Sequence, residues 1–457
     1  MGKRKMVDSG VEWIGMVPEE WDIGPIKSIL RISATRTTGE NLYVGMENIE
    51  AGTGKYISGE DARTSDFGVN SKFSKGEILF GKLRPYLRKV WLADRDGSCS
   101  TEFLVMSTNN IETNRFFSYV LISEEFCSLV NDSCKGVKMP RADWAGVSSI
   151  RSPIPPLEEQ QAIADFLDHH ISLIDRERDL ISQKIDLLKE KKKSIIFECV
   201  TGKRTIVEAQ ALAGVDDWSD IVGVGEMVAI PTPKKDDPFV KEGKLVDSGV
   251  EWIGEIPGGW NTEKVGQLTS TTSGGTPKNS IKNYGGDVSW ATTTDLNNGI
   301  LYSTKTTITN DGLKESSAKI VPPRSILMAM YGASIGKIAI TGKNMATNQS
   351  VIAILPVETT NYKFLFYGMV ASKDYLIELG SGAGQPNISQ EIVRNLRMPT
   401  PPPKEQQAIA DFLDCNVSLI EREYGLLVQK IEMLNEKKKA LIFEITTGKT
   451  SVNEFNK

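Results

Sequence analysis

Apolar residues recur at alternating spacings of four and three positions in two long stretches of the chain. The first stretch predicts a helix over residues 157–203, with Arg178 and Lys192 interrupting its apolar stripe. The second predicts a helix that begins near residue 404, with Lys438 interrupting the stripe close to its end. A sustained heptad repeat with charged flanks is typical of a coiled coil. The expected seam residues are Leu167, Ile174, Ile181, Ile185 and Leu188 in the first helix and Leu413, Ile420, Leu427, Ile431 and Leu434 in the second.

Both predicted helices have clear boundaries. A proline-rich segment precedes each one, SPIPPLEEQ and TPPPKEQQ, and a glycine, Gly202 or Gly448, stands near each end. About 43 residues at ~1.5 Å each would give a rod on the order of 65 Å long. Because the two stripes are near copies, we expect the helices to pair with each other, antiparallel, about a pseudo-twofold axis.

The helices belong to a duplicated sequence. QQAIADFLD at residues 160–168 returns at 406–414, and 29 of 44 positions are identical between residues 160–203 and the segment 246 residues later. A second repeat, VDSGVEWIG, opens each half at Val7 and Val246. Residues 22–149 and 261–394 show almost no similarity to each other. The chain is therefore two tandem copies of one unit that carry two different inserts.

The inserts have a mixed pattern. Short β-prone runs such as GEILF, KVWLA, SILMAM and SVIAIL alternate with turns rich in Gly, Asn and Thr, and helical patterns occur near residues 114–130 and 361–379. The predicted fold class is α+β, with two such domains separated by a long antiparallel two-helix coiled coil. The predicted segments are a first domain at 1–156, a helix at 157–203, a connector at 204–244, a second domain at 245–403 and a helix with a tail at 404–457.

Composition adds limits to this picture. The 457 residues are 40% apolar and 25% charged with a net charge of -5, which is typical of a globular protein. No apolar run approaches the ~20 residues of a membrane span, so no membrane is expected as a partner and the cytoplasm is the expected location. The five cysteines form no CxxC pair and the only histidines are His169 and His170, which argues against a zinc site or a disulfide framework.

Catalytic motifs are absent from the sequence. GASIGK at residues 332–337 has three residues between its glycines where a phosphate-binding loop needs four, and Ile338 stands where Ser or Thr should bind magnesium. Glu190, Lys191 and Lys192 match a fragment of a nuclease motif but lie on the predicted coiled coil, where a solvated helical face explains them. We expect no catalytic residue and no metal on this chain.

The repeated motifs have a familiar arrangement. A proline-rich turn, EQQAIADFLD, a long heptad helix, EKKK and TGK, used twice around two unlike domains, resembles the specificity subunit of type I restriction-modification enzymes. GEILFGKLRPYL at residues 76–87 is similar to one class of target-recognition domain. SGGTP, GASIGK, NQS and GQPNIS in the second insert are similar to another class.

The resemblance implies a function and a set of partners. It implies a non-catalytic subunit that reads a bipartite, asymmetric sequence in double-stranded DNA, with one half-site per domain and a spacer set by the helices. Two methyltransferase subunits would bring S-adenosylmethionine, and two motor-nuclease restriction subunits would bring ATP and Mg²⁺. No cofactor is then expected on this chain.

The residues themselves offer candidates for DNA contact. Base readout needs Arg, Lys, Asn or Gln side chains on a rigid platform, while other contacts to phosphate fix the register. For any single residue, a solvated surface charge or a structural turn is an equal alternative. The candidates are Lys82, Arg84, Tyr86, Arg88, Lys89, Lys138 and Arg141 in the first insert and Thr276, Lys278, Tyr331, Ser334, Lys337, Gln385 and Asn387 in the second.

Two alternatives remain open at the level of sequence. The chain could be a coiled-coil scaffold that binds proteins through its two domains, or the specificity chain of a different DNA defence system. The repeats EQQAIADFLD and VDSGVEWIG could supply two equivalent surfaces for two methyltransferases. Trp13 and Trp252 lie in the two copies of VDSGVEWIG. They could instead anchor the start of each half to its own domain or helix.

Overall fold

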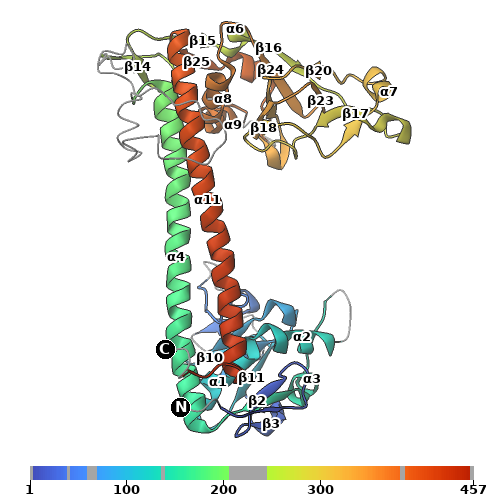
Figure 1. Cartoon of the computed structure of the whole chain (residues 1–457), viewed down its shortest axis with the longest axis vertical. Coiled ribbons are helices and arrows are strands. Elements are labelled where there is room, and N and C mark those ends of the chain that lie inside the picture. Colours follow the sequence, from blue (N-terminus) through green and yellow to red (C-terminus); the bar gives the residue numbers. More distant parts are fainter. Residues whose placement is uncertain are drawn as a thin grey trace. The chain divides into compact units, whose positions relative to one another are not determined.

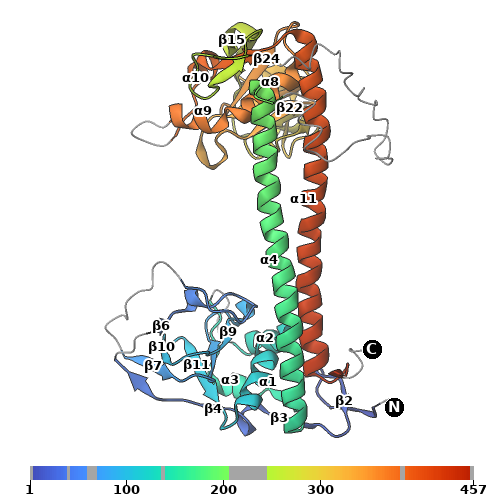
Figure 2. The same cartoon turned by 90° about the vertical axis from the view of Figure 1, so that its left-hand side faces the viewer.

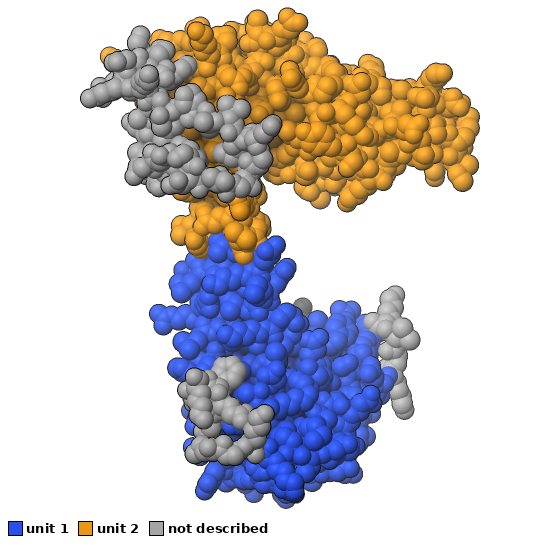
Figure 3. All heavy atoms as spheres, in the orientation of Figure 1, with its two compact units in different colours: residues 1–183, 427–457 blue, residues 184–426 orange. Residues whose placement is uncertain are grey.

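The computed structural model describes residues 4–38, 42–58, 69–134, 139–204, 244–380 and 386–452. The chain forms two compact units, shown in separate colours in Figure 3. Unit 1 contains residues 1–183 and 427–457, and unit 2 contains residues 184–426. Each unit thus combines one insert with part of both long helices. The predicted connector, 204–244, lies almost entirely outside the described residues.

The two long helices are α4 (Leu157–Thr201) and α11 (Pro403–Thr446). In unit 1 the first part of α4 lies beside the last part of α11 (Figures 1 and 2), and an ion pair joins them. Lys438 Nζ lies 3.1 Å from Asp175 Oδ1. The residue that interrupts the apolar stripe of α11 therefore has a charged partner on the facing helix.

Unit 2 repeats this pairing with the helices exchanged. Lys192 bonds to Glu421, and these two positions are equivalent to Lys438 and Asp175 at the 246-residue offset of the sequence repeat. The helices are therefore antiparallel in each unit, and α4 and α11 exchange roles between the two pairings. A second set of equivalent ion pairs, each with an N–O distance of 2.7 Å, is Lys430–Glu177 in unit 1 and Lys184–Glu423 in unit 2.

The stripe residues that the heptad pattern predicted at the seam are mostly inaccessible to solvent. Leu427 and Ile431 are half-buried. The other eight are buried, at 8% exposure or less: Leu167, Ile174, Ile181, Ile185, Leu188, Leu413, Ile420 and Leu434.

The described part of unit 1 has two four-stranded sheets that share a core. Leu79, Trp91 and Val105 from one sheet pack against Phe73 and Cys99 from the other. One sheet has the order β4 (Arg31–Ile32), β11 (Phe103–Ser107), β8 (Ile78–Gly81) and β9 (Val90–Leu92). The other has the order β5 (Arg36–Thr37), β7 (Asn70–Phe73), β10 (Gly97–Cys99) and β6 (Tyr43–Val44).

Helices connect the sheets of unit 1 to the long helix. α1 (Ile111–Ile122) and α2 (Glu124–Asp132) lie between the sheets and α4 (Figure 2). Asn110 caps α1 and Ser123 caps α2, each by accepting hydrogen bonds from backbone N–H groups of the first turn. Three short elements and a hairpin complete the unit: α3 (Trp144–Ser149), β3 (Asp22–Pro25) paired with β12 (Arg151–Ile154), and β1 (Met6–Asp8) paired with β2 (Met16–Pro18).

Unit 2 is built in the same way. Its larger sheet has the order β16 (Thr269–Ser273), β24 (Val351–Pro356), β21 (Ile326–Ala329), β22 (Ile338–Thr341) and β18 (Ile300–Leu301). Its smaller sheet has the order β19 (Thr307–Ile308), β17 (Tyr284–Ala291), β23 (Met345–Thr347) and β20 (Ile320–Val321). α8 (Tyr362–Ala371) and α9 (Lys373–Leu379) lie between the sheets and the long helices (Figure 1). The remaining named elements are α6 (Val265–Leu268), α7 (Asn310–Lys314), α10 (Gln390–Asn395), and the pairs β13 (Leu245–Asp247) with β14 (Glu255–Pro257) and β15 (Asn261–Lys264) with β25 (Arg397–Thr400).

The two inserts share a set of strand pairings although their sequences do not match. In the sheet of unit 1 that contains β8 and in the five-stranded sheet of unit 2, an inner strand, β8 or β21, pairs antiparallel with one strand on each side. In the other sheet of each unit one strand, β10 or β23, has one parallel and one antiparallel neighbour. The predicted α+β class with a tandem pseudo-twofold repeat is confirmed, and the repeat extends to the inserts.

The repeated motifs outside the helix seam hold each unit together. Gly448 and Gly202 follow the two long helices with φ values of 71° and 70°. A Cβ atom on Gly448 would come within 2.5 Å of Pro18, and one on Gly202 within 2.5 Å of Pro257. The indole of Trp13 donates to Arg151 O, and that of Trp252 donates to Arg397 O, both at 3.1 Å. The two indole hydrogen bonds anchor the VDSGVEWIG repeat of each unit to the domain of the same unit.

Within the described residues, no helix is long and apolar enough to cross a membrane. The same part of the chain holds no group of three or more His, Cys, Asp or Glu side chains placed to bind a metal ion.

Candidate nucleic-acid interface

The loop between β8 and β9 carries most of the basic residues predicted to bind DNA in the first insert. It contains a short 3-10 turn, Pro85–Leu87, between two residues in the left-handed conformation, Arg84 with φ 52° and Arg88 with φ 51°. A non-glycine residue in this region costs roughly 1–2 kcal/mol because its Cβ crowds the following carbonyl oxygen. The loop is therefore strained at two positions four residues apart.

The loop between β21 and β22 of unit 2 repeats several features of this backbone. Its left-handed residues are Gly332, with φ 76°, and Gly336, with φ 71°, again four residues apart. Gly81 N donates to Lys89 O at 2.8 Å and Ala329 N donates to Lys337 O at 2.9 Å, so the loops also close in the same way. Unit 2 uses glycine, which tolerates this backbone, at the two places where unit 1 uses arginine.

A second segment lies against each loop. In unit 1, Leu83 and Arg141 form an isolated antiparallel bridge, and in unit 2 Tyr331 and Asn387 form the equivalent one. Ala142 N donates to Lys82 O at 2.9 Å, and Ile388 N donates to Met330 O at 2.7 Å. Residues far apart in the sequence therefore meet at one surface in each unit. Arg141 lies opposite Leu83, the residue before Arg84, in unit 1, and Asn387 lies opposite Tyr331 in unit 2.

The surface around the loop at residues 82–89 of unit 1 is basic. Arg141 Nη2 lies 2.8 Å from Glu102 Oε1, which fixes the direction of its guanidinium. Burial lowers the pKa of Lys82, Glu102 opposes this change, and the positive charges of Arg141 and Arg36 add to it. Arg84 is exposed, and the ring-bearing side chain of Tyr86 is 51% exposed beside it. Such a surface can bind phosphates and the edges of bases.

Two basic residues predicted at this site are engaged inside the domain instead. Arg88 Nη1 lies 3.6 Å from Glu124 Oε2, and the Arg88 guanidinium packs against Gly52. Lys89 Nζ donates to Met46 O at 2.6 Å, and burial lowers the pKa of Lys89. The structure thus separates Arg88 and Lys89 from Lys82, Arg84, Tyr86 and Arg141. Lys138 lies outside the described residues.

The surface around the loop at residues 330–337 of unit 2 has fewer charged side chains and more neutral hydrogen-bonding groups than the equivalent surface of unit 1. Ser350 Oγ donates to the Tyr331 hydroxyl at 3.0 Å, and the Thr276 hydroxyl donates to Gln349 Oε1. Asn387 is exposed beside Tyr331. Among the other predicted residues of this insert, Lys278 and Lys337 are exposed, Ser334 is half-buried, and Gln385 lies outside the described residues.

The structure adds residues that the sequence did not mark. Arg36 on β5 is exposed, donates to Ser71 Oγ at 2.9 Å and acts electrostatically on Lys82. Glu102 orients Arg141, and Ser350 orients Tyr331. Arg36 stands outside the basic run of residues 72–95 and Glu102 is acidic, so only the folded topology brings them to the site.

The family of this chain follows from its sequence match. Residues 18–187 and 257–432 match the type I restriction modification DNA specificity domain. The chain belongs to this family. Each matched segment runs from the start of one α+β domain into the following long helix, which is the unit that the sequence repeat and the fold both define.

Relatives with curated names agree. The chain is 26% identical to the type I restriction enzyme HindI specificity subunit of Haemophilus influenzae, over 88% of this chain and 93% of that protein. It is 32% identical to the MjaIX specificity subunit of Methanocaldococcus jannaschii, over 40% of this chain and 44% of that protein, so this match spans less than half of the relative.

Solved structures show the same fold. One chain, from work on complex assembly and conformational transition of the type I R-M system, has a TM-score of 0.69 at 18% identity and covers 95% of this chain and 99% of its own length. The HsdS subunit from Thermoanaerobacter tengcongensis has a TM-score of 0.51 at 17% identity and covers 95% of this chain and 98% of its own. The chain is a type I specificity subunit with two DNA-recognition domains, as its repeated motifs predicted.

Proposed function

We propose that this specificity subunit reads a bipartite, asymmetric sequence in double-stranded DNA, with one half-site for each α+β domain. The observation that supports this most strongly is the pair of equivalent loops at residues 82–89 and 330–337. The loops share two left-handed positions and the hydrogen bond that closes them, and they differ in almost every exposed side chain. The same frame therefore offers two different sets of groups to DNA, which is what two unlike half-sites need.

The chemistry of the two loops suits different base edges. Unit 1 offers Arg84 and Arg141, whose guanidinium groups can donate two parallel hydrogen bonds to one base. Unit 2 offers Tyr331 and Asn387, and a carboxamide both donates and accepts, as the major-groove edge of adenine requires. In this proposal three lysines bind DNA phosphates and so fix the register of the protein on the duplex: Lys82, Lys278 and Lys337.

The proposal includes two methyltransferase subunits and two motor-nuclease restriction subunits, held on the long helices. Exposed leucines support this part. In unit 1, Leu173 and Leu180 of α4 are 50% and 56% exposed at heptad spacing. In unit 2, the equivalent residues of α11 are Leu419, half-buried, and Leu426, 59% exposed. Two equivalent apolar helix faces suit helical segments from two copies of one partner.

Catalysis belongs to the partners in this proposal. The methyltransferases would carry S-adenosylmethionine and the motor-nuclease subunits would carry ATP and Mg²⁺, while this chain supplies sequence recognition in the cytoplasm. The alternative function, a protein scaffold for which DNA is irrelevant, predicts no sequence-selective binding of duplex DNA by the assembled complex.

The first experiment is co-expression of this chain with the methyltransferase subunit encoded beside it, followed by long-read mapping of modified adenines. We expect a gapped, asymmetric motif that disappears when this chain is left out. Absence of any motif, with both proteins expressed and associated, would favour the scaffold function.

A domain exchange tests the assignment of one half-site to each unit. Strands β3 and β12 pair at the base of the first domain, and Ile26 N donates to Ile150 O at 2.9 Å just beyond them. Residues 26–150 can therefore be replaced with the same segment of another specificity subunit. We expect one half-site to change and the other to stay. A change in both half-sites would contradict the modular arrangement.

Charged substitutions test the helix faces. Leu173→Lys with Leu180→Lys should remove one methyltransferase from the complex, and Leu419→Lys with Leu426→Lys should remove the other. Gln183→Lys, at an exposed polar position, is the control. Native mass spectrometry counts the bound subunits, and full occupancy in both double variants would exclude these faces as docking sites.

A further inference from the structure

We propose that Arg84 reads a guanine in the half-site recognised by unit 1. This inference rests on the proposed function and deepens it, because it names one residue and one base. It starts from a difference between two equivalent loops that share two left-handed positions. Unit 2 has glycine at both left-handed positions, whereas unit 1 holds arginine there, at Arg84 and Arg88.

The strain at Arg88 is compensated inside the domain. The Arg88 guanidinium lies 3.6 Å from the carboxylate of Glu124, the first residue of α2, and it packs against Gly52. Arg88 therefore has a structural reason to be arginine. Its replacement by glycine would remove contacts within the domain.

Arg84 has no such compensation. Its side chain is exposed and makes no hydrogen bond or ion pair with any residue that the structure describes. Its backbone is nevertheless held firmly, since Arg84 N donates to Pro140 O at 2.9 Å and Leu87 N donates to Arg84 O at 2.9 Å. Strained residues that the surrounding structure holds in place are concentrated at functional sites. An exposed guanidinium on a firmly held backbone is available to bind a group outside the chain.

The chemistry of that partner follows from the neighbours of Arg84. Arg141 and Lys82 make the surface basic, which suits DNA, and the exposed ring of Tyr86 lies two residues away. A guanidinium on a rigid backbone matches the O6 and N7 acceptors of guanine in the major groove with two hydrogen bonds. Gly332 occupies the equivalent place in unit 2 and has no side chain, so this contact is specific to the half-site of unit 1.

The test uses Arg84→Gly in the complex with the methyltransferase, with methylated adenines mapped genome-wide. Glycine suits the left-handed backbone, so the midpoint of thermal unfolding should stay the same or rise. We expect one G·C pair in one half-site to become degenerate, with its discrimination falling about 10- to 100-fold. The other half-site should keep its sequence. Arg84→Lys keeps the charge and can still donate to guanine, so it should retain more of the guanine preference than Arg84→Gly.

The matched control is Arg88→Gly, which makes the same change of residue four positions later in the same loop. It should lower thermal stability and leave the motif unchanged. Three results would overturn the inference: a uniform loss of methylation over all sites in Arg84→Gly, which indicates a phosphate contact; relaxation at an A·T pair; or an unchanged motif. Lack of a gapped motif with the unmodified chain would instead refute the proposed function, so the two failures are distinguishable.

Discussion

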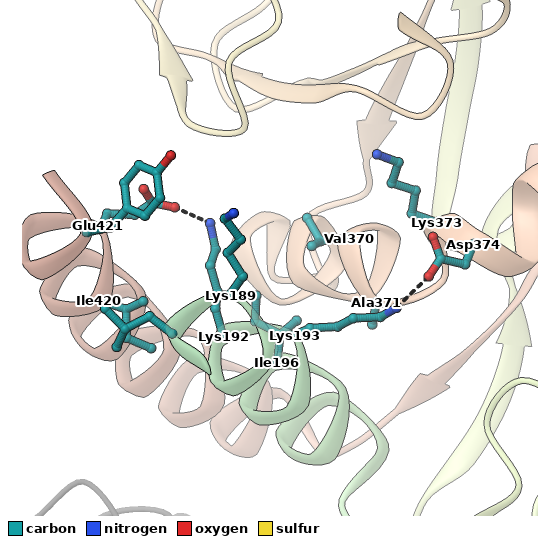
Figure 4. Close-up of a pocket in the computed structure, with 12 residues that line it drawn as sticks. Lys189, Lys192, Lys193, Ile196, Val370, Ala371, Lys373, Asp374, Ile420 and Glu421 are labelled. Atoms are coloured by element: carbon teal, nitrogen blue, oxygen red, sulfur yellow. Dashed lines mark hydrogen bonds and ion pairs between the residues drawn. The ribbon is translucent and has the colours of Figure 1, made fainter. Parts of the chain in front are cut away.

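Two equivalent ion pairs on the long helices have very different surroundings. In unit 1, Lys438 and Asp175 are each 8% exposed, and Lys55 Nζ lies 3.0 Å from the same carboxylate. In unit 2, Lys192 is 25% and Glu421 is 53% exposed. The second pair lines an open cavity of about 490 Å³ between α4, α8, α9 and α11, shown in Figure 4. Repeated residues thus form one buried and one accessible pair.

The inserts cause this difference. The segment that ends at the isolated bridge between Ile49 and Tyr56 brings Lys55 onto Asp175 in unit 1. In unit 2 the corresponding place is the cavity, with Val370 and Ala371 of α8 on its wall. The helix sequence was duplicated, but the contribution of each ion pair to stability depends on how far the diverged insert buries it.

The environment also changes the protonation chemistry of the buried pair. Burial lowers the pKa of Lys438, and the charge of Asp175 offsets this effect only in part. Burial alone would raise the pKa of Asp175, but the ammonium groups of Lys438 and Lys55 outweigh it and lower that pKa. Two buried charges, with the half-exposed Lys55 beside them, make unit 1 sensitive to the loss of Lys438 or Asp175.

The largest expected effect is that of Lys438→Ala, because it leaves the Asp175 carboxylate buried with only the half-exposed Lys55 as a partner. Removal of one member of a buried pair costs about 3–5 kcal/mol. Chemical unfolding of the complex with and without the substitution measures the loss. The double variant Lys438→Leu with Asp175→Leu is the control and should recover most of the stability, because it removes both charges. No loss in the single variant would mean that the pair is open to water.

Acid should reduce the stability that the Lys438–Asp175 ion pair provides. The reduction should not exceed the loss in Lys438→Ala. The pKa of Asp175 is lower in the folded chain than its ordinary value of about 3.9, so the unfolded chain binds more protons in this range. The contribution of Asp175 is therefore fully present above about pH 4 and is lost as the pH falls through the lowered pKa. Unfolding measured from pH 6 downward checks this. The double leucine variant lacks the carboxylate, and an equally steep loss in that variant would assign the effect to other groups.

Where the two units agree, substitutions should have equal effects. Gly448→Ala and Gly202→Ala should each destabilise by about 1–2 kcal/mol, because alanine is disfavoured in the left-handed conformation. The contacts of the new Cβ with Pro18 or Pro257 act in the same direction. Gly425→Ala is the control, since this glycine lies inside α11 with open space around it and alanine there should add about 0.5–1 kcal/mol. Unequal losses at Gly448 and Gly202 would show that the two helix ends are not equivalent.

The long helices could be predicted from sequence because their signals are local. A seven-residue apolar period needs no knowledge of the partner, and the duplication itself indicated which helix the partner is. The reason for Lys438 on the apolar stripe could not be predicted, because its partner Asp175 is 263 residues away and depends on the antiparallel register. Lys55 reaches the same carboxylate from an insert with no repeat to indicate it.

The candidate DNA interface was predictable only in part. Clustered arginines in LRPYLRK indicated a basic surface, but not that Arg84 and Arg88 point to different places. The equivalence of this loop with YGASIGK is hidden in the sequence, since arginine is not expected in a left-handed conformation and glycine is. Local preference fails at both Arg84 and Arg88: contacts within the domain explain Arg88, and the proposed guanine contact would explain Arg84.

The smallest expected effect is that of Lys192→Ala, which removes the unit 2 counterpart of Lys438. Its partner Glu421 is more than half exposed, so water can solvate the carboxylate when the lysine is lost. An accessible ion pair contributes about 0–1 kcal/mol, and it is weakened further by salt. Unfolding at low and high ionic strength should show a small loss that disappears with added salt, whereas the loss in Lys438→Ala should persist. If Lys192→Ala instead costs as much as Lys438→Ala at both salt concentrations, the repeated helices alone would set the strength of both pairs. Burial by the diverged insert would then contribute nothing.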